Sequence, residues 1–128
     1  MPAPHEFEYA ILRVVPHVER EEFINVGIIF YCRALKYLDA IIQVDPARLR
    51  ALAPDLDLAA TQIELETIPR ICAGGKSAGA LGELTLDERF KWLVSPRSAT
   101  IQISPAHSGL CDDPKIEMET LRKKILGE

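Results

Sequence analysis

Three β-rich segments that follow one another at short intervals constrain the fold of this chain more than any other feature. They read EYAILRVVP at 8–16, FINVGIIFYC at 23–32 and KYLDAIIQV at 36–44. Isoleucine, valine and aromatic residues favour strands, and the alternation of apolar residues indicates which side of each strand is buried. Strands joined by such short connections must run antiparallel. The three segments therefore predict an antiparallel meander.

The alternation within these strands also predicts a polar sheet face. The first segment is apolar on both faces except at Arg13 and its ends, as expected of a central strand. In the second segment the apolar face consists of Ile24, Val26, Ile28, Phe30 and Cys32. Its mixed face consists of Phe23, Asn25, Gly27, Ile29 and Tyr31. The same parity places polar side chains on the face opposite the helices, namely Arg13, Asn25, Asp39, Gln43 and Gln102.

Capping residues mark the starts of three predicted helices. These starts are Asp45-Pro46 and Asp113-Pro114, each with aspartate at the N-cap and proline at N1, and the capping box of Thr85 and Glu88. A further helix is expected over 56–68, where Pro69 ends or kinks it, and 98–104 alternates as a fourth strand. The elements predict an α+β fold of two layers, a four-stranded, mainly antiparallel sheet with helices packed on one face.

The length of the chain and two unusual segments set the expected domain organisation. The 128 residues predict a single domain, 1–128, with an ordinary core. Residues 1–7 are expected to form a loose N-terminal leader, and they lack the basic and apolar regions of a secretory signal. The stretch AGGKSAGALGE at 73–83 holds four of the seven glycines and predicts a flexible loop.

Charge, cysteines and hydropathy restrict the classes of function. No apolar run approaches the ~20 residues that span a bilayer, so no membrane partner is expected. The net charge of −4 argues against nucleic-acid binding, which needs clustered lysine and arginine. Three cysteines, without a CxxC pair, indicate reduced thiols and a cytoplasmic protein. Neither a phosphate-binding glycine motif nor a nucleophile elbow is present, so Ser108 has no standard nucleophile context. No cofactor is expected.

The stretch ISPAHSGLCDDP at 103–114 gathers residue types that carry chemistry. Asp113 caps the last helix and Asp112 adds favourable negative charge to its start, so both have a structural role. His107 and Ser108 do not, and they are expected in a turn at the exit of the fourth strand, with Gly109 supplying a positive φ. The alternatives are a reactive histidine and a histidine that only bonds a loop carbonyl.

A second cluster is the connection PHVEREE after the first strand. A solvated acidic loop is the default interpretation of such a charge run. The functional interpretation needs His17 and Glu19, with Glu21 as a further carboxylate, to converge with His107 at one end of the sheet. There two histidines and carboxylates would hold a divalent transition metal. No spacing within the group is diagnostic of a metal site, so the metal site is the weaker alternative.

Two groups are typical of binding surfaces. Arg13, Asn25 and Tyr31 combine charge, amide and aromatic ring on the predicted open sheet face. Arg89, Trp92 and Arg97 form the other group, because Trp92 lies off the apolar stripe of its helix and would anchor a partner together with Arg97. The alternative is that the first group is simply a wet sheet face and that Trp92 covers the edge of the core.

The blocks YAILRVVPHVEREEFINVGIIFYC and ERFKWLVSPRSATIQISPAHSGLCDDP resemble a family of short bacterial proteins known as domain of unknown function 3037. The resemblance spans nearly the whole chain and is loosest in the glycine-rich middle. It brings no catalytic residues with it. It implies a partner, because members are encoded beside a kinase-like protein similar to the HipA toxins. The blocks contain the PHVERE loop, Asn25, Arg89, Arg97 and the HSG turn, which ranks these residues above others.

Two functions of different classes are compatible with these patterns. The first, favoured by the lack of a catalytic motif, is a non-catalytic interaction or accessory module that docks a protein such as a HipA-like kinase. The second is a small hydrolase, a nuclease or nucleotide-processing enzyme, with His107 as general acid or base, assisted by His17 or Glu19 and a metal ion. In it Arg89 or Arg97 would bind phosphate. The hydrolase requires His17 and His107 to meet at a common point.

Overall fold

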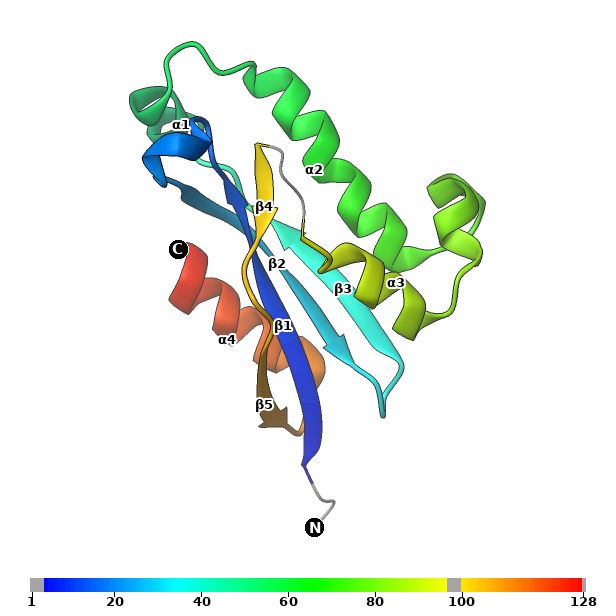
Figure 1. Cartoon of the computed structure of the whole chain (residues 1–128). Helices are drawn as coiled ribbons and strands as arrows, with labels where there is room; N and C mark the ends of the chain where they lie inside the picture. Colours follow the sequence, from blue (N-terminus) through cyan, green and yellow to red (C-terminus); the bar gives the residue numbers. More distant parts are fainter. Residues whose placement is uncertain (1–3, 97–99, 128) are drawn as a thin grey trace.

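The computed structural model describes residues 4–96 and 100–127 and shows, within them, a five-stranded antiparallel sheet with helices on both sides (Figure 1). The strands are β1 (His5–Val14), β2 (Ile24–Cys32), β3 (Tyr37–Ile42), β4 (Ile101–Ile103) and β5 (His107–Cys111). The helices are α1 (Pro46–Leu52), α2 (Leu58–Ala73), α3 (Leu86–Leu93) and α4 (Pro114–Leu126). Two 3-10 segments complete the chain, η1 (Val18–Arg20) and η2 (Lys76–Glu83).

The order of the strands confirms the predicted α+β class and the meander. β3, β2 and β1 follow one another, and both β4 and β5 pair with the remaining edge of β1. The prediction of four strands is wrong, because residues 107–111, expected to be a turn, pair with the first half of β1. The leader is also shorter than expected, since β1 begins at His5. This pairing is stabilised by contacts distant in sequence, such as the Phe7 ring packed against Gly109.

Two bulges at the same level of the sheet flank β1. Between the pairs Leu12–Gly27 and Arg13–Asn25, β1 advances by one residue and β2 by two. On the other side, between Leu12–Ile103 and Tyr9–His107, β1 advances by three residues and its neighbour by four. There the buried Ser104 hydroxyl accepts the N–H of Ile11 at 2.8 Å, which keeps the ladder closed. Beyond each extra residue, the side chains of that strand point to the face opposite the one that simple alternation predicts.

The bulge in β2 corrects the predicted parity of that strand. Before it, Ile24 and Val26 face a first core cluster, but after it Ile29 and Tyr31 face that cluster instead. The alternate residues Ile28, Phe30 and Cys32 face a second cluster on the opposite side of the sheet. The prediction that Tyr31 shares the polar face with Arg13 and Asn25 is therefore wrong, because alternation across a bulge does not preserve the face.

The two clusters lie on opposite faces, so the prediction that helices pack on one face only is also wrong. The first face, which carries Leu12 and Val14 of β1, is covered by α1, α2 and α3. The second face, which carries Phe7 and Tyr9 of β1, is covered by α4 through Met118 and other apolar residues of that helix. Figure 1 shows α4 and the pair α2 and α3 on opposite sides of the sheet. Helices thus form two layers, with the sheet between them.

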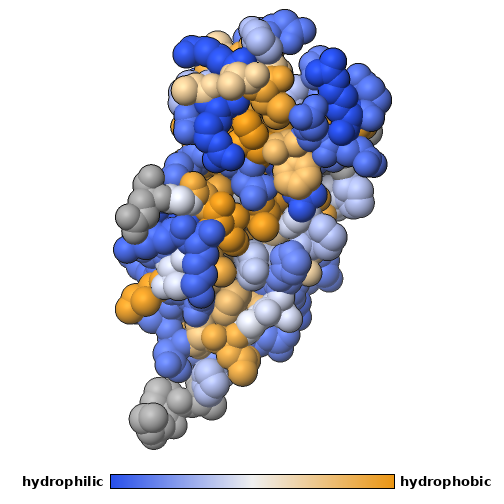
Figure 2. Space-filling model, turned by 90° about the vertical axis from the view of Figure 1, so that its left-hand side faces the viewer, coloured by the Kyte–Doolittle hydropathy of each residue, from blue (hydrophilic) through white to orange (hydrophobic). Residues whose placement is uncertain are grey.

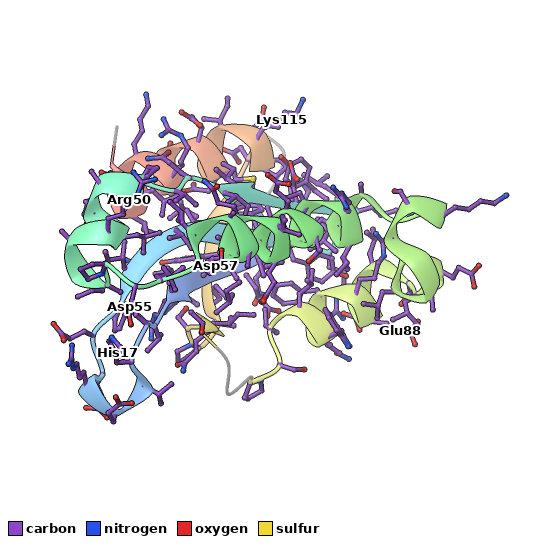
Figure 3. The ribbon with its side chains drawn as sticks, turned by 90° about the horizontal axis from the view of Figure 1, so that it is seen from above. His17, Arg50, Asp55, Asp57, Glu88 and Lys115 are labelled. Atoms are coloured by element: carbon purple, nitrogen blue, oxygen red, sulfur yellow. The ribbon has the colours of Figure 1, made fainter. Side chains whose placement is uncertain are left out.

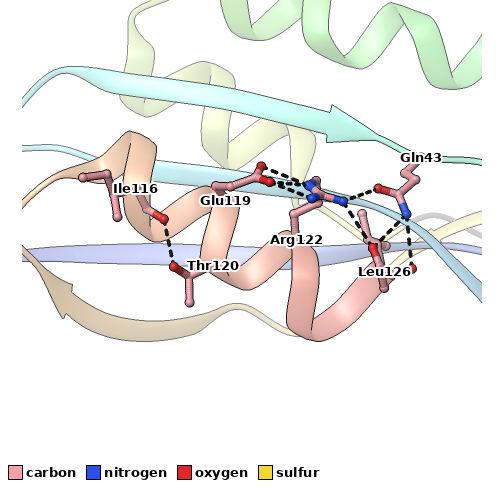
Figure 4. A network of polar contacts seen from close by, with 7 residues as sticks. Gln43, Ile116, Glu119, Thr120, Arg122 and Leu126 are labelled. Atoms are coloured by element: carbon pink, nitrogen blue, oxygen red, sulfur yellow. Dashed lines mark hydrogen bonds and ion pairs between the residues drawn. The ribbon is translucent and has the colours of Figure 1, made fainter.

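A polar network fixes the C-terminal end of α4 to the sheet (Figure 4). Arg122 donates to Gln43 Oε1 at 2.8 Å and forms an ion pair with Glu119 at 2.6 Å. Gln43 Nε2 in turn donates to the carbonyls of Leu126, at 3.3 Å, and Gly127, at 3.1 Å. Gln43, predicted on an open polar face, therefore contacts the last turn of α4, a contact between residues too far apart in the sequence for the strand pattern to predict.

The helix starts agree with the capping residues of the sequence. Asp45 and Asp113 accept backbone N–H groups at their N-caps, and Thr85 with Glu88 forms the reciprocal capping box. α2 differs from its prediction, because it continues through Pro69 to Ala73. The glycine-rich stretch after it contains the 3-10 turns of η2. Within residues 4–96 and 100–127, no helix is both long and apolar enough to cross a bilayer.

We expect Gly27→Ala to destabilise the fold, because the bulge brings other strands close to this glycine. A Cβ there would lie 2.7 Å from the carbonyl oxygen of Ile41 and 3.0 Å from a methyl group of Leu12. Overpacking of this kind costs about 1–3 kcal/mol. Urea denaturation measures the loss, and Ser77→Ala on the exposed η2 segment is the control, expected within about 0.5 kcal/mol of wild type. A Gly27→Ala protein as stable as wild type would contradict the close packing of the bulge.

Candidate functional site

The uncovered part of the second face carries a patch of charged, amide and aromatic side chains. We call it the Arg13 patch, and it consists of Arg13, Val18, Phe23, Asn25 and Gln102. The register places Arg13 of β1 directly opposite Asn25 of β2 and opposite Gln102 of β4, as the parity predicts. α4 ends beside Gln43, and the strands continue beyond its end to this group. Three strands therefore hold the patch in place.

The patch combines a cation with exposed apolar surface. The guanidinium carbon of Arg13 lies 4.3 Å from the centre of the Phe23 ring, a cation–π contact. Phe23 is 45% exposed, and Val18 in η1 is 53% exposed. A hollow of about 430 Å³ is lined by Arg13, Val15, Val18, Glu21, Phe23 and Gln102. Figure 2 looks at this side of the molecule and shows hydrophobic side chains at the surface, bordered by hydrophilic ones.

Two polar atoms of the patch are buried without a hydrogen-bond partner. They are Nε of Arg13 and Oδ1 of Asn25. Such an unmade bond costs about 1–3 kcal/mol, because the atom has lost its contact with water. Because Arg13 is only half-buried, the arrangement is suited to a ligand that brings a carboxylate or carbonyl oxygen to the exposed part of its guanidinium.

Tyr31, predicted as part of this surface, lies in the first core cluster. It is only 4% exposed, and its ring centre is 4.9 Å from that of Phe90 on α3. The bulge in β2 is the reason, since it turns Tyr31 toward α3 and away from Arg13. Tyr31 therefore stabilises the fold from the opposite side of the sheet.

Arg89, also predicted as a binding residue, is buried and bonded to the backbone. Its Nη1 donates to the carbonyls of Ile71 at 2.8 Å and Cys72 at 2.7 Å, and its Nε donates to Leu84 O at 3.1 Å. These carbonyls belong to the last turns of α2 and to the residue before the cap of α3. A Cβ on Gly74 would lie 2.6 Å from Arg89 Nη1, which explains a glycine there. Arg89 therefore joins two helices.

Arg89 and Trp92, predicted in one group with Arg97, do not share a surface. Trp92 is 40% exposed on α3, whereas Arg89 on the same helix is buried. Arg97 lies outside the described residues. Trp92 and the Arg13 patch lie on opposite sides of the sheet, because α3 covers the first face.

The structure separates the two histidines of the proposed hydrolase. His107 pairs with Tyr9 in the middle of β1, its ring 5.2 Å from the Tyr9 ring, and Ser108 is exposed beside it. His17 lies beyond the last residue of β1, at the N-cap of η1, and Glu19 is exposed within η1 (Figure 3). The stretch from Tyr9 to Val14 alone spans about 17 Å at 3.3 Å per residue. The expected convergence of His17 and Glu19 with His107 therefore does not occur.

Other chemistry-bearing groups are inaccessible or dispersed. Across the two described segments, no three or more His, Cys, Asp and Glu side chains are placed to hold a metal ion. All three cysteines are buried as free thiols. Burial raises the pKa of Cys72 to about 12, and burial next to Cys32 raises the pKa of Cys111 to about 11. These two thiols stay protonated at neutral pH and are poor nucleophiles.

Val18 of the patch was not found from the sequence, and Glu21, which lines the same hollow, was considered there only for the metal site. Both lie in the charged connection PHVEREE after β1, where Val18 stands among charged residues and histidine. An apolar residue kept exposed within a charged connection is a signal that points to contact with a partner. Their neighbours in the patch come from strands, so only the folded chain shows that they line the same hollow.

One comparison with known proteins gives a match. A family model described as "Protein of unknown function (DUF3037)" matches residues 9–126, nearly the whole chain. No curated protein and no solved structure matches it.

We expect Arg89→Met to lower the free energy of unfolding by about 3 kcal/mol, because buried carbonyls of α2 and Leu84 lose a charged donor. Arg89→Lys should recover part of this loss, since an ammonium group reaches fewer of the carbonyls. Urea denaturation provides the measurement, and Arg50→Met on the exposed side of α1 serves as the matched control. Unchanged stability of Arg89→Met would show that the guanidinium does not join the helices.

Proposed function

We infer a function from one premise: this chain belongs to the family of proteins of unknown function DUF3037, which it matches over residues 9–126. Membership brings no activity with it, so the inference depends on the residues themselves. We propose that the protein is a non-catalytic interaction module and that the Arg13 patch docks a partner protein. The Nε of Arg13, buried and unpaired beside an exposed aromatic ring, is the observation that carries the proposal.

A guanidinium with one buried, unpaired nitrogen at the edge of a hollow favours binding. The free protein already carries the cost of removing the Arg13 Nε from water. Arg13 is half-buried, so a partner oxygen that reaches the exposed part of its guanidinium gains a charge-assisted hydrogen bond, while the cost of burying Nε has already been met. Phe23 holds the guanidinium from one side, so little side-chain freedom is lost on binding. These features are those of an energetically dominant residue at an interface.

The chemistry of the patch favours an acidic or amide-bearing loop of a folded partner. The exposed part of the Arg13 guanidinium favours a carboxylate or carbonyl oxygen of the partner. Phe23 and Val18 add exposed apolar area beside them. Because the chain carries a net charge of −4, attraction of an acidic partner must be local to Arg13. The same net charge disfavours a nucleic-acid partner.

The candidate partner is the HipA-like kinase that the family resemblance implies, in the cytoplasm of a bacterium. Three buried, unpaired cysteines are consistent with such a reducing compartment. We prefer the interaction module to a hydrolase because His107 pairs with Tyr9 in the middle of β1, whereas His17 lies beyond the last residue of that strand. A nuclease or nucleotide-processing site built on both would need them at one point.

Arg13→Glu should weaken binding to a HipA-like kinase encoded beside the gene for this protein by about 30-fold or more. This is the effect of losing an interface residue that contributes at least about 2 kcal/mol to binding. Isothermal titration calorimetry with purified proteins gives Kd for wild type and variant. Arg50→Glu is the matched control, because it makes the same charge change at an exposed position of α1 (Figure 3). Phe23→Ala should weaken binding by a smaller factor, since it removes the apolar contact but leaves the cation.

Two outcomes would contradict different parts of the proposal. A kinase that does not bind the wild-type protein rejects this kinase as the partner. A kinase that binds Arg13→Glu as tightly as wild type and Arg50→Glu rejects the Arg13 patch as the docking site. Thermal unfolding of each variant shows that a loss of binding does not come from a loss of fold.

A further inference from the structure

The strand β5 leaves one edge of the sheet open. Alternate residues of a strand direct their backbone N–H and C=O groups to opposite edges. The Ile11 N–H donates to the Ser104 hydroxyl, and the Ile11 carbonyl accepts the Ser104 N–H. The Val15 N–H donates to the Thr100 carbonyl at 2.6 Å. The backbone groups of the odd-numbered residues of β1 therefore point toward β4 and β5. Their partners on β5 are His107, Gly109 and Cys111. Ser108 and Leu110 therefore direct their backbone groups away from β1.

The other edges of the sheet are protected, and β5 is not. Proteins blunt exposed strand edges with charges, proline and bulges. On β3, the Asp39 carboxylate accepts the N–H of Ala40 at 2.8 Å. Beside β4, Pro105 and the bulge interrupt the edge. The sequence HSGLC of β5 has no acidic side chain, lysine, arginine or proline, and Leu110 is 64% exposed. Within the described residues no strand pairs with its outer edge.

We propose that β5 pairs with β5 of a second copy of this chain, antiparallel, about a two-fold axis at Gly109. In that register Ser108 of each copy lies opposite Leu110 of the other. Each of these two pairs exchanges two backbone hydrogen bonds, because Ser108 and Leu110 are the residues whose groups face outward. Every outward donor thus meets an acceptor of the second copy. The two five-stranded sheets become one continuous sheet.

The strand is self-complementary in its side chains as well as its backbone. Gly109 lies on the axis, where two copies of one residue face each other, and it has no side chain to collide. Leu110 gains a neighbour on the side where it is now exposed. An interface in which residue i meets j and j meets i is the commonest way for soluble proteins to associate. The Arg13 patch lies in the other half of the sheet, so the dimer presents two patches.

Ser108→Pro tests the pairing between copies without removing a hydrogen bond between β5 and β1. Proline removes the Ser108 N–H, which faces away from β1, and edge strands accept proline at such positions. Ser108→Ala keeps the N–H and is the matched control. Light scattering after size exclusion, over a dilution series, should give twice the chain mass of 14.3 kDa for wild type and Ser108→Ala. Ser108→Pro should give the mass of one chain.

Leu110→Glu is a second variant in case Ser108→Pro does not fold. Its side chain is exposed in the single chain, so the fold tolerates it, and it brings two carboxylates into the paired strands. Hydrogen exchange adds an independent observation, because the amides of Ser108 and Leu110 are protected only when the second copy pairs with them. A wild-type protein that stays monomeric at every concentration overturns the proposal. So does a dimer that survives both Leu110→Glu and a folded Ser108→Pro.

Discussion

The pairing of β1 on both edges, with a bulge on each side at Leu12, is the constraint on which the rest of the structure depends. β1 itself is regular and keeps its alternation from His5 to Val14. On each side of β1 the neighbouring chain, β2 or the β4–β5 segment, contains one extra residue at the same level. Beyond it, the side chains of that neighbour point to the opposite face. As a result the apolar residues of the two halves of the sheet accumulate on opposite sides, and a single helical layer cannot cover them.

The two helical layers follow from this exchange. α2 and α3 cover the cluster that contains Leu12 and Val14, and α4 covers the cluster that contains Phe7 and Phe30. α4 is held by Met118 and Leu121 in the core and by Arg122 at its end, where Gln43 closes its last turn. Among residues 4–96 and 100–127, α4 covers the second face as far as Gln43, and the Arg13 patch lies beyond that point.

The sequence predicted well whatever depends on neighbours in the chain. The caps at Asp45 and Asp113 and the shared face of Arg13, Asn25 and Gln102 need only a short-range pattern. Arg89 was misassigned, because nothing local shows that the carbonyls of Ile71 and Cys72 await its guanidinium. His17 and His107 were expected to converge, because two loop histidines look equivalent until the register of β5 is known.

By itself, therefore, the sequence determined the meander, the helix starts, the α+β class and the charged residue at the centre of the patch. Each of these follows from periodicity or capping within a few residues. Only the tertiary structure decided the strand at His107–Cys111, the side of Tyr31 and the layer formed by α4. A β-bulge adds one residue without a distinctive sequence, and the face of every residue beyond it then depends on which distant strand pairs with it.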